Sequence, residues 1–86
     1  MTQDTTYLAT EDHYSTYDLG QSAALVSLGF QIVAFDKSNP RKIQFVFQRS
    51  AELDKAVEAY WDDQLQVRAR SMFDSVKMLK NRIYSA

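Results

Sequence analysis

Two runs of residues with strong β-strand preference lie close together in the middle of the chain. Residues 30–36 and 42–48 are rich in Val, Ile and Phe, which favour strands. The five residues between them include Asn39-Pro40, a pair that favours a turn. The spacing predicts an antiparallel hairpin, and any fold of this chain has to accommodate it.

The second predicted strand alternates cleanly between apolar and polar residues. Ile43, Phe45 and Phe47 fall on one face, with Lys and Gln on the other. Aromatic strands of this kind also stack on bases in RNA-recognition domains, but the glycine of that motif is absent here. We therefore interpret Phe45 and Phe47 as core residues.

The first predicted strand is apolar on both faces. Alternation places Phe30, Ile32 and Ala34 on one face, and Val33 and Phe35 on the other. A two-stranded sheet is only marginally stable, so the hairpin needs helices over one face. Its open edges and its second apolar face favour a homodimer, in which two hairpins form a four-stranded sheet.

Three segments have the apolar periodicity of helices, namely 16–28, 51–62 and 69–84. Gly29 fits the left-handed position after the first helix, and Ser50 fits the N-cap of the second. The expected core stripe of the third helix is Met72, Phe73, Val76, Leu79 and Ile83. The three helices provide the cover that the hairpin needs.

The start of the first helix carries its own sequence signals. Ser15 and Asp18 are spaced as an N-capping pair, and Tyr14 and Leu19 as a hydrophobic staple. Gly20 inside the helix costs about 1 kcal/mol relative to alanine. Close approach of another backbone is a reason to keep a glycine there.

A length of 86 residues is enough for one domain. We predict a loose N-terminal arm at 1–13 and a single α+β domain at 14–86, in the order helix, strand, strand, helix, helix. Small secreted domains usually depend on disulfides, so the absence of Cys favours the cytoplasm. No apolar run is long enough to cross a bilayer and no secretory signal is apparent, so we expect no membrane partner.

Few residues are suited to catalysis or to metal binding. With no Cys and only His13, the usual nucleophile–base pairs are nearly exhausted, and no Gly-rich phosphate loop is present. Glu58 and Asp62 share a helix face beside Asp63, but calcium needs six or more oxygen ligands. We expect no enzymatic activity, no cofactor and no metal, and we interpret these four residues as solvated.

Charge is divided unevenly along the chain. Residues 1–40 contain five acids and one base, whereas residues 41–86 contain six acids and nine bases. The basic residues of the last helical region are Arg68, Arg70, Lys77, Lys80 and Arg82. Clustered Lys and Arg favour contact with phosphates, although five are few for a nucleic-acid site. An ordinary solvated helix face is the alternative interpretation.

A second set of residues fits an interface with protein. Its members are Gly20, Val33, Phe35, Tyr60 and Trp61, because aromatic residues are enriched at interface centres. The same aromatic residues also fit a core. The leading hypothesis is a small non-catalytic module that acts through protein contacts, with a second copy or another protein as partner. The alternative is a DNA- or RNA-binding accessory protein that uses the basic helix.

An ordered set of short motifs spans residues 14–84. The motifs are Tyr14-x-x-x-Asp18-Leu19, Leu28-Gly29-Phe30, Phe45-Val46-Phe47, Glu52-Leu53, Tyr60-Trp61, Val67 and Leu79-Lys80-Asn81-Arg82-Ile83-Tyr84. This set resembles a family of short bacterial and phage proteins classed as a domain of unknown function. The resemblance implies no activity and no catalytic residue; it implies a bacterial or phage genome and a cytoplasmic setting.

The chain departs from the pattern of that family at two places. Members often carry a Gly after the Tyr-Trp pair and a Pro at the start of the last helix. Asp62-Asp63 and Ala69 occupy these places here. Both departures lie at predicted helix boundaries, one at the end of the second helix and one at the start of the third.

Overall fold

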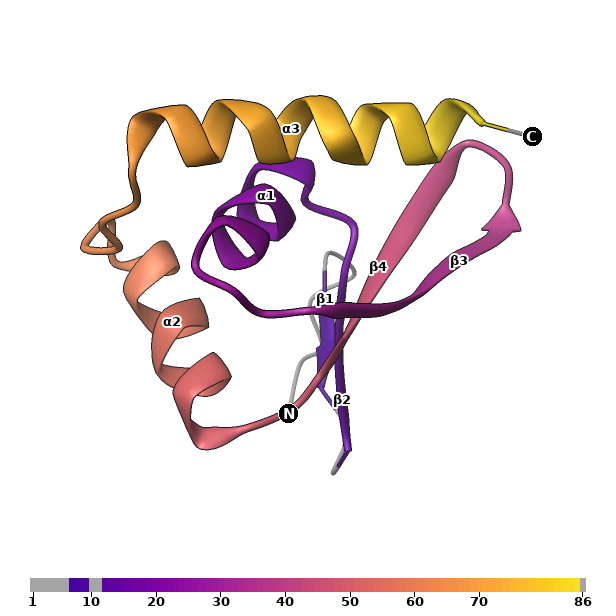
Figure 1. The fold of residues 1–86 in the computed structure, drawn as a ribbon. Coiled ribbons are helices and arrows are strands. Elements are labelled where there is room, and N and C mark those ends of the chain that lie inside the picture. Colours follow the sequence, from indigo (N-terminus) through magenta and orange to yellow (C-terminus); the bar gives the residue numbers. More distant parts are fainter. Residues whose placement is uncertain (1–6, 10–11, 86) are drawn as a thin grey trace.

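The computed structural model of the protein describes residues 7–9 and 12–85, which form four strands and three helices (Figure 1). In chain order the elements are β1 (Tyr7–Ala9), β2 (His13–Thr16), α1 (Leu19–Ser27), β3 (Ile32–Asn39), β4 (Lys42–Gln48), α2 (Ala51–Trp61) and α3 (Ala69–Tyr84). The expected α+β class, the hairpin and the three helices are confirmed. The two strands before α1 were not predicted.

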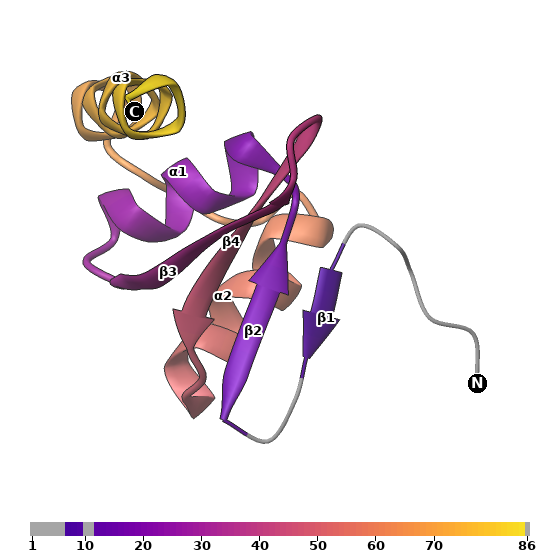
Figure 2. The same cartoon turned by 90° about the vertical axis from the view of Figure 1, so that its right-hand side faces the viewer.

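The sheet is antiparallel and has the strand order β1-β2-β4-β3. The helices lie on one of its faces, and Figure 2 looks onto the face that they leave uncovered. The prediction of a two-stranded sheet is wrong, because β2 pairs with the edge of β4 that the hairpin alone leaves open. One chain thus completes a four-stranded sheet without a second copy at that edge.

β2 occupies the place where the sequence pattern predicted the start of a helix. Tyr14 and Thr16 alternate as strand residues, pair with Phe47 and Phe45, and are buried. Tyr14 is therefore not a hydrophobic staple, and Ser15 is not an N-cap. Residues 7–9 of the predicted arm form β1, while residues 1–6 and 10–11 lie outside the described residues.

The first helix starts three residues later than predicted, at Leu19. Asp18 is its N-cap, and the Asp18 Oδ1 accepts a hydrogen bond of 3.0 Å from the backbone amide of Gln21. The Gln21 side chain turns into the core instead of back to the cap. There its Oε1 accepts a hydrogen bond of 2.7 Å from the hydroxyl of Tyr14.

α1 is the central element of the core. Residues 21–25 are all buried, because the sheet covers one side of the helix and α2 and α3 cover the others (Figure 1). The buried apolar cluster is Tyr14, Ala23, Leu25, Phe45, Phe47, Leu53, Ala56 and Leu79. The interpretation of Phe45 and Phe47 as core residues is confirmed.

β3 carries a register irregularity between Ile32 and Ala34. Ile32 pairs with Phe47 and Phe35 pairs with Phe45, so these two β3 residues lie on the helix-covered face, while Ala34 pairs with Val46 on the opposite face. The expected placement of Phe35 on the outer face with Val33 is wrong. The extra residue of a β-bulge shifts the alternation by one position.

Strand β3 is joined to the end of α3 by hydrogen bonds from Lys37. The ammonium group of Lys37 donates to the carbonyl oxygens of Arg82 and Ser85, at 3.4 and 3.5 Å. A cation at this place complements the negative end of the helix dipole. Beside it, hydrogen bonds from the hydroxyl and the amide of Ser38 lower the pKa of Asp36.

α1 and α2 end in the same backbone arrangement. The amides of Gly29 and Phe30 donate to the carbonyls of Val26 and Leu25, at 2.9 and 3.1 Å, and Gly29 has a φ of 103°. This is a Schellman motif, as the sequence predicted. α2 ends in the same motif, in which the backbone amides of residues 63 and 64 donate to the carbonyl oxygens of residues 60 and 59. Its left-handed residue is Asp63, with a φ of 59°.

Replacing Asp63 with glycine is expected to stabilise the protein by about 1 kcal/mol. The change removes a Cβ from a left-handed conformation and a negative charge from the negative end of a helix. The melting temperature is expected to rise by roughly 4–8 °C in a calorimetric scan. Asp63→Ala is the matched control, because it removes the charge but keeps the Cβ. Equal stabilisation by both variants would contradict the backbone explanation.

Candidate functional site

The basic residues predicted to form one patch are divided by the structure. Arg68 is the N-cap residue of α3, whereas Arg70, Lys77 and Lys80 lie on its solvent-exposed side. Arg82 lies in the last turn and faces β3, where its guanidinium carbon is 5.0 Å from the ring centroid of Phe35. Three of the five cations therefore share a surface.

Two exposed aromatic rings complete that surface. Phe73 is 66% exposed and Tyr84 is 81% exposed. Residues spaced by three and four positions lie on one side of a helix, which places five side chains in one line along α3. We call this line the basic–aromatic stripe; it consists of Arg70, Phe73, Lys77, Lys80 and Tyr84.

The stripe lies away from the side of α3 that packs on the protein. Leu79 and Ser75 are the buried residues of the helix, and the expected core role of Phe73 is wrong. Within the stripe, the ammonium nitrogen of Lys77 is 5.2 Å from the ring centroid of Phe73, a cation–π contact. Asp74 is the one acidic residue in the helix.

The residues predicted as a protein interface fall into two groups: Gly20 and Trp61 both lie beside Tyr60, whereas Val33 and Phe35 lie in β3. Val33 and Trp61 remain 51% and 46% exposed, but Phe35 faces the covered side of the sheet. Trp61 packs edge-to-face on Tyr60, with the ring centroids 5.3 Å apart. The structure does not bring these residues together as one patch.

Gly20 is explained by a contact within the chain. A Cβ at this position would lie 3.3 Å from the hydroxyl oxygen of Tyr60 and 3.4 Å from the Oδ1 of Asp18. The expected close neighbour was a backbone, whereas the neighbours found are these two side chains. The Tyr60 hydroxyl donates to Asp18 Oδ2 at 3.4 Å, which links α2 to the N-cap of α1.

This contact changes the acidity of Tyr60. Partial burial raises the pKa of the hydroxyl, and the adjacent Asp18 carboxylate raises it further. Both effects disfavour the phenolate, because it would be poorly solvated and repelled by a negative charge. Tyr60 is therefore a structural link between two helices and is not suited to act as a base.

Stability is expected to depend on Tyr60 at alkaline pH. Its pKa is higher in the folded state than in the unfolded state, so its contribution is complete below about pH 10 and is lost as pH rises further. The unfolding free energy of the unmodified protein should therefore fall more steeply above pH 10 than that of Tyr60→Phe. Urea unfolding at pH 8 to 11 measures this difference. Parallel curves for the two proteins would contradict the assignment.

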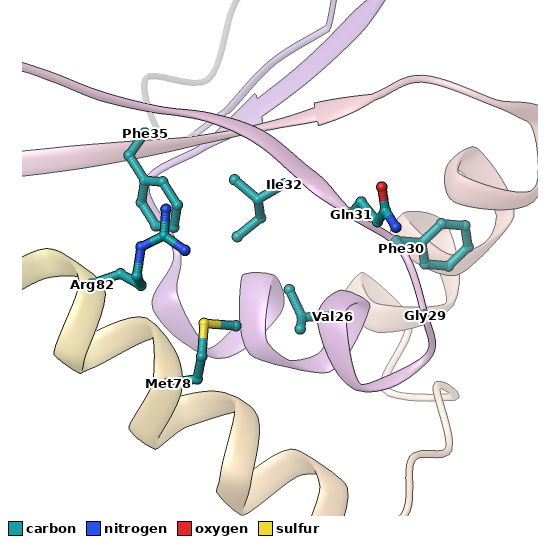
Figure 3. A pocket seen from close by; sticks show the side chains of 8 residues that line it. All are labelled: Val26, Gly29, Phe30, Gln31, Ile32, Phe35, Met78 and Arg82. Carbon is teal, nitrogen blue, oxygen red and sulfur yellow. The ribbon is translucent and has the colours of Figure 1, made fainter.

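A groove of about 340 Å³ opens between α1, β3 and α3 (Figure 3). Val26 of α1, Ile32 and Phe35 of β3 and Met78 of α3 provide its apolar walls. The guanidinium group of Arg82 stands beside the Phe35 ring at one end of the groove (Figure 3). The groove thus combines an apolar interior with one cation.

The residues weighed for metal binding do not form a cluster. Within residues 7–9 and 12–85, no group of three or more His, Cys, Asp or Glu side chains is placed to hold a metal ion. His13 is exposed in β2, and the acidic residues at the end of α2 are exposed as well. No helix among the described residues has both the length and the apolar character needed to cross a membrane.

Sequence reasoning missed the aromatic part of the stripe and the groove. Phe73 follows an apolar residue at the edge of the predicted core stripe, so periodicity alone assigned it to the interior. Its spacing to Lys77, together with that of Lys80 to Tyr84, is the signal that links the rings to the cations. No local pattern indicates the groove, because its walls come from three elements.

One family model matches residues 11–85 of the chain, and its description is a domain of unknown function (DUF5659). The resemblance deduced from the ordered motifs is thus confirmed at the level of the family. No match was found to a curated protein or to a solved structure.

Proposed function

We propose that this chain, which belongs to the DUF5659 family, is a non-catalytic binding module whose basic–aromatic stripe binds single-stranded nucleic acid. The observation that carries the proposal is the presence of three cations and two exposed rings along one side of α3. The cations suit phosphates, and the rings suit bases. Single-stranded nucleic acid is present in the cytoplasm, the compartment that the absence of Cys favours.

The exposed rings favour a single strand over a duplex. Nonspecific single-strand binders combine positive charge along the backbone with aromatic rings on which bases stack. The bases of a duplex are already stacked on each other, so Phe73 and Tyr84 would gain little from one.

The size of the stripe predicts modest, salt-sensitive binding. Each phosphate neutralised on a single strand contributes about 0.7 to the slope of log K against log salt. Three cations therefore give a slope of about −2. Arg82 faces Phe35 and Arg68 is the N-cap residue of α3, so both lie outside the stripe and neither is expected to contribute.

Fluorescence anisotropy with fluorescein-labelled 12-nucleotide poly-dT, poly-U and a 12-base-pair duplex tests the proposal between 20 and 200 mM salt. Both single strands should bind more tightly than the duplex. Phe73→Ala should weaken single-strand binding roughly 5- to 100-fold, since stacking contributes about 1–3 kcal/mol per base. Lys77→Gln should reduce the salt slope by about 0.7.

Lys55→Gln is the matched control, because Lys55 is an exposed lysine on α2 and lies outside the stripe. It should leave single-strand binding unchanged. Absence of binding at 20 mM salt, equal binding of the duplex, or equal loss with Lys55→Gln would each contradict the proposal. Binding to vesicles with anionic lipids but to neither single strand would indicate a membrane surface instead.

Contact with protein is the second candidate function. The groove between α1, β3 and α3 is the observation that favours it, since the five residues first considered for an interface do not form one patch.

A further inference from the structure

The groove beside Arg82 combines features that together indicate what kind of ligand it can bind. Its walls are aliphatic, aromatic and thioether side chains from three elements. A volume of about 340 Å³ lies at the lower end of the range for ligand sites, which is about 300–1,000 Å³. The groove therefore has room for one large apolar side chain and a small polar group, and it is too small for a large cofactor.

Among the described residues, no carboxylate compensates the charge at the end of the groove. The ion pair found among the described residues joins Arg49 and Asp54, so no described carboxylate is paired with Arg82. A cation–π contact with Phe35 holds the guanidinium group beside the ring, and N–H groups that do not face the ring remain able to bind a carboxylate. Figure 3 shows this group beside the apolar walls.

The position of the groove also favours a ligand over an internal role. Met78, on its α3 side, is exposed. The flexible thioether side chain of methionine is well suited to surfaces that adapt to a partner. β3 is the edge strand of the sheet, so the groove opens at a free border of the molecule. A partner chain can reach it without any rearrangement of the fold.

We propose that this groove is a peptide-binding site, which takes a large apolar side chain of a partner protein between Val26, Ile32 and Met78 and a neighbouring carboxylate on Arg82. The site rests on the second candidate function, contact with protein, and it is separate from the nucleic-acid proposal, because Met78 and Arg82 lie outside the basic–aromatic stripe. The two surfaces are independent, and one chain can hold a nucleic acid and a protein partner together.

Selection from a phage-displayed library of random 12-residue peptides, with the full chain immobilised, tests the site. Enriched peptides are expected to carry Leu, Phe or Trp within a few positions of Asp or Glu. Binding of the strongest synthetic peptide, measured by calorimetry, should weaken at least tenfold with Arg82→Gln. Met78→Glu should weaken it as well, because it places a like charge beside the carboxylate.

Lys80→Gln is the control, since it removes a cation from the same helix but outside the groove. It should leave peptide binding unchanged. At 200 mM salt, where charges outside the stripe are largely screened, Arg82→Gln and Met78→Glu should weaken single-strand binding much less than Lys77→Gln does. Failure of one proposal is thus distinguished from failure of the other. Both groove variants change exposed side chains, and their melting curves confirm that they fold.

Three outcomes would overturn the peptide site. They are a library that enriches no peptide, enrichment only of peptides without an acidic residue, and enriched peptides whose binding does not change with Arg82→Gln. If octanoate, but none of the peptides, shifts the amide NMR signals of the groove residues, the groove is a site for a small amphiphile instead. A dimer in sedimentation velocity that Met78→Glu dissociates would assign it to a second copy of the chain.

Discussion

Replacing Tyr14 with alanine is expected to lower the free energy of unfolding by about 3–5 kcal/mol, the cost of removing a large aromatic side chain from a core. Tyr14 is buried in β2 opposite Phe47, and its hydroxyl donates to the buried side chain of Gln21. The alanine variant loses both the packing and the hydrogen bond. Urea unfolding monitored by circular dichroism measures the change.

Tyr14→Phe separates these two contributions. It keeps the ring but leaves the Gln21 Oε1 without its donor, so we expect a loss of about 1–3 kcal/mol. A loss below about 1 kcal/mol for Tyr14→Ala would place residue 14 outside the core. That outcome would restore the helix start that the sequence pattern suggested and remove β2 from the sheet.

Leu79→Ala is expected to cost about 2–5 kcal/mol. Leu79 is fully buried and belongs to the core cluster, against which Met72, Val76 and Ile83 of α3 also pack. Phe73→Ala, six residues away on the same helix, is expected to change stability by no more than about 0.5 kcal/mol because the ring is mostly exposed. Thermal unfolding of both variants compares the two sides of α3.

The contrast between these variants matters for the binding experiments. If Phe73→Ala is as stable as the unmodified protein, its effect on nucleic-acid binding reports the ring itself. Destabilisation of Phe73→Ala by more than 1 kcal/mol would mean that Phe73 packs in the core, as periodicity suggested, and that the stripe has one exposed ring only.

The parts of the fold that were predicted correctly depend on local signals. β4 alternates over seven residues, Ser50 caps α2 through a hydrogen bond to the amide of Leu53, and Gly29 has the left-handed backbone expected after α1. Each of these signals involves residues within a few positions of each other. Tertiary contacts are not needed to interpret them.

The parts that were missed depend on contacts between distant segments. β2 has only four residues, and its stability comes from pairing with β4 and from burial of Tyr14 and Thr16. No local sequence signal indicates the register irregularity in β3 either, so the face occupied by Phe35 was predicted incorrectly. Asp18 and Ser15 both fit a capping pattern, and only the presence of β2 decides between them.

The candidate surfaces also divide into features that the local sequence predicts and features that depend on tertiary contacts. The cations of α3 were identified from the sequence, because charge is a property of each residue. Which of them share a surface with exposed rings, and which one turns toward Phe35, depends on how α3 packs on α1 and the sheet. The groove depends entirely on that packing.

The pairing of β2 with β4 has a consequence for the order in which the protein is assembled. β2 is separated in sequence from β4 by the whole of α1 and β3, so its partner strand is synthesised only after both. β3 and β4 are joined by a tight turn and can pair as soon as they exist, because closing a short loop costs little entropy. The hairpin then acts as the template on which the earliest part of the chain folds. A nascent chain cut short before residue 42 has no place to bury Tyr14, and exposes it until the second half of the protein is made.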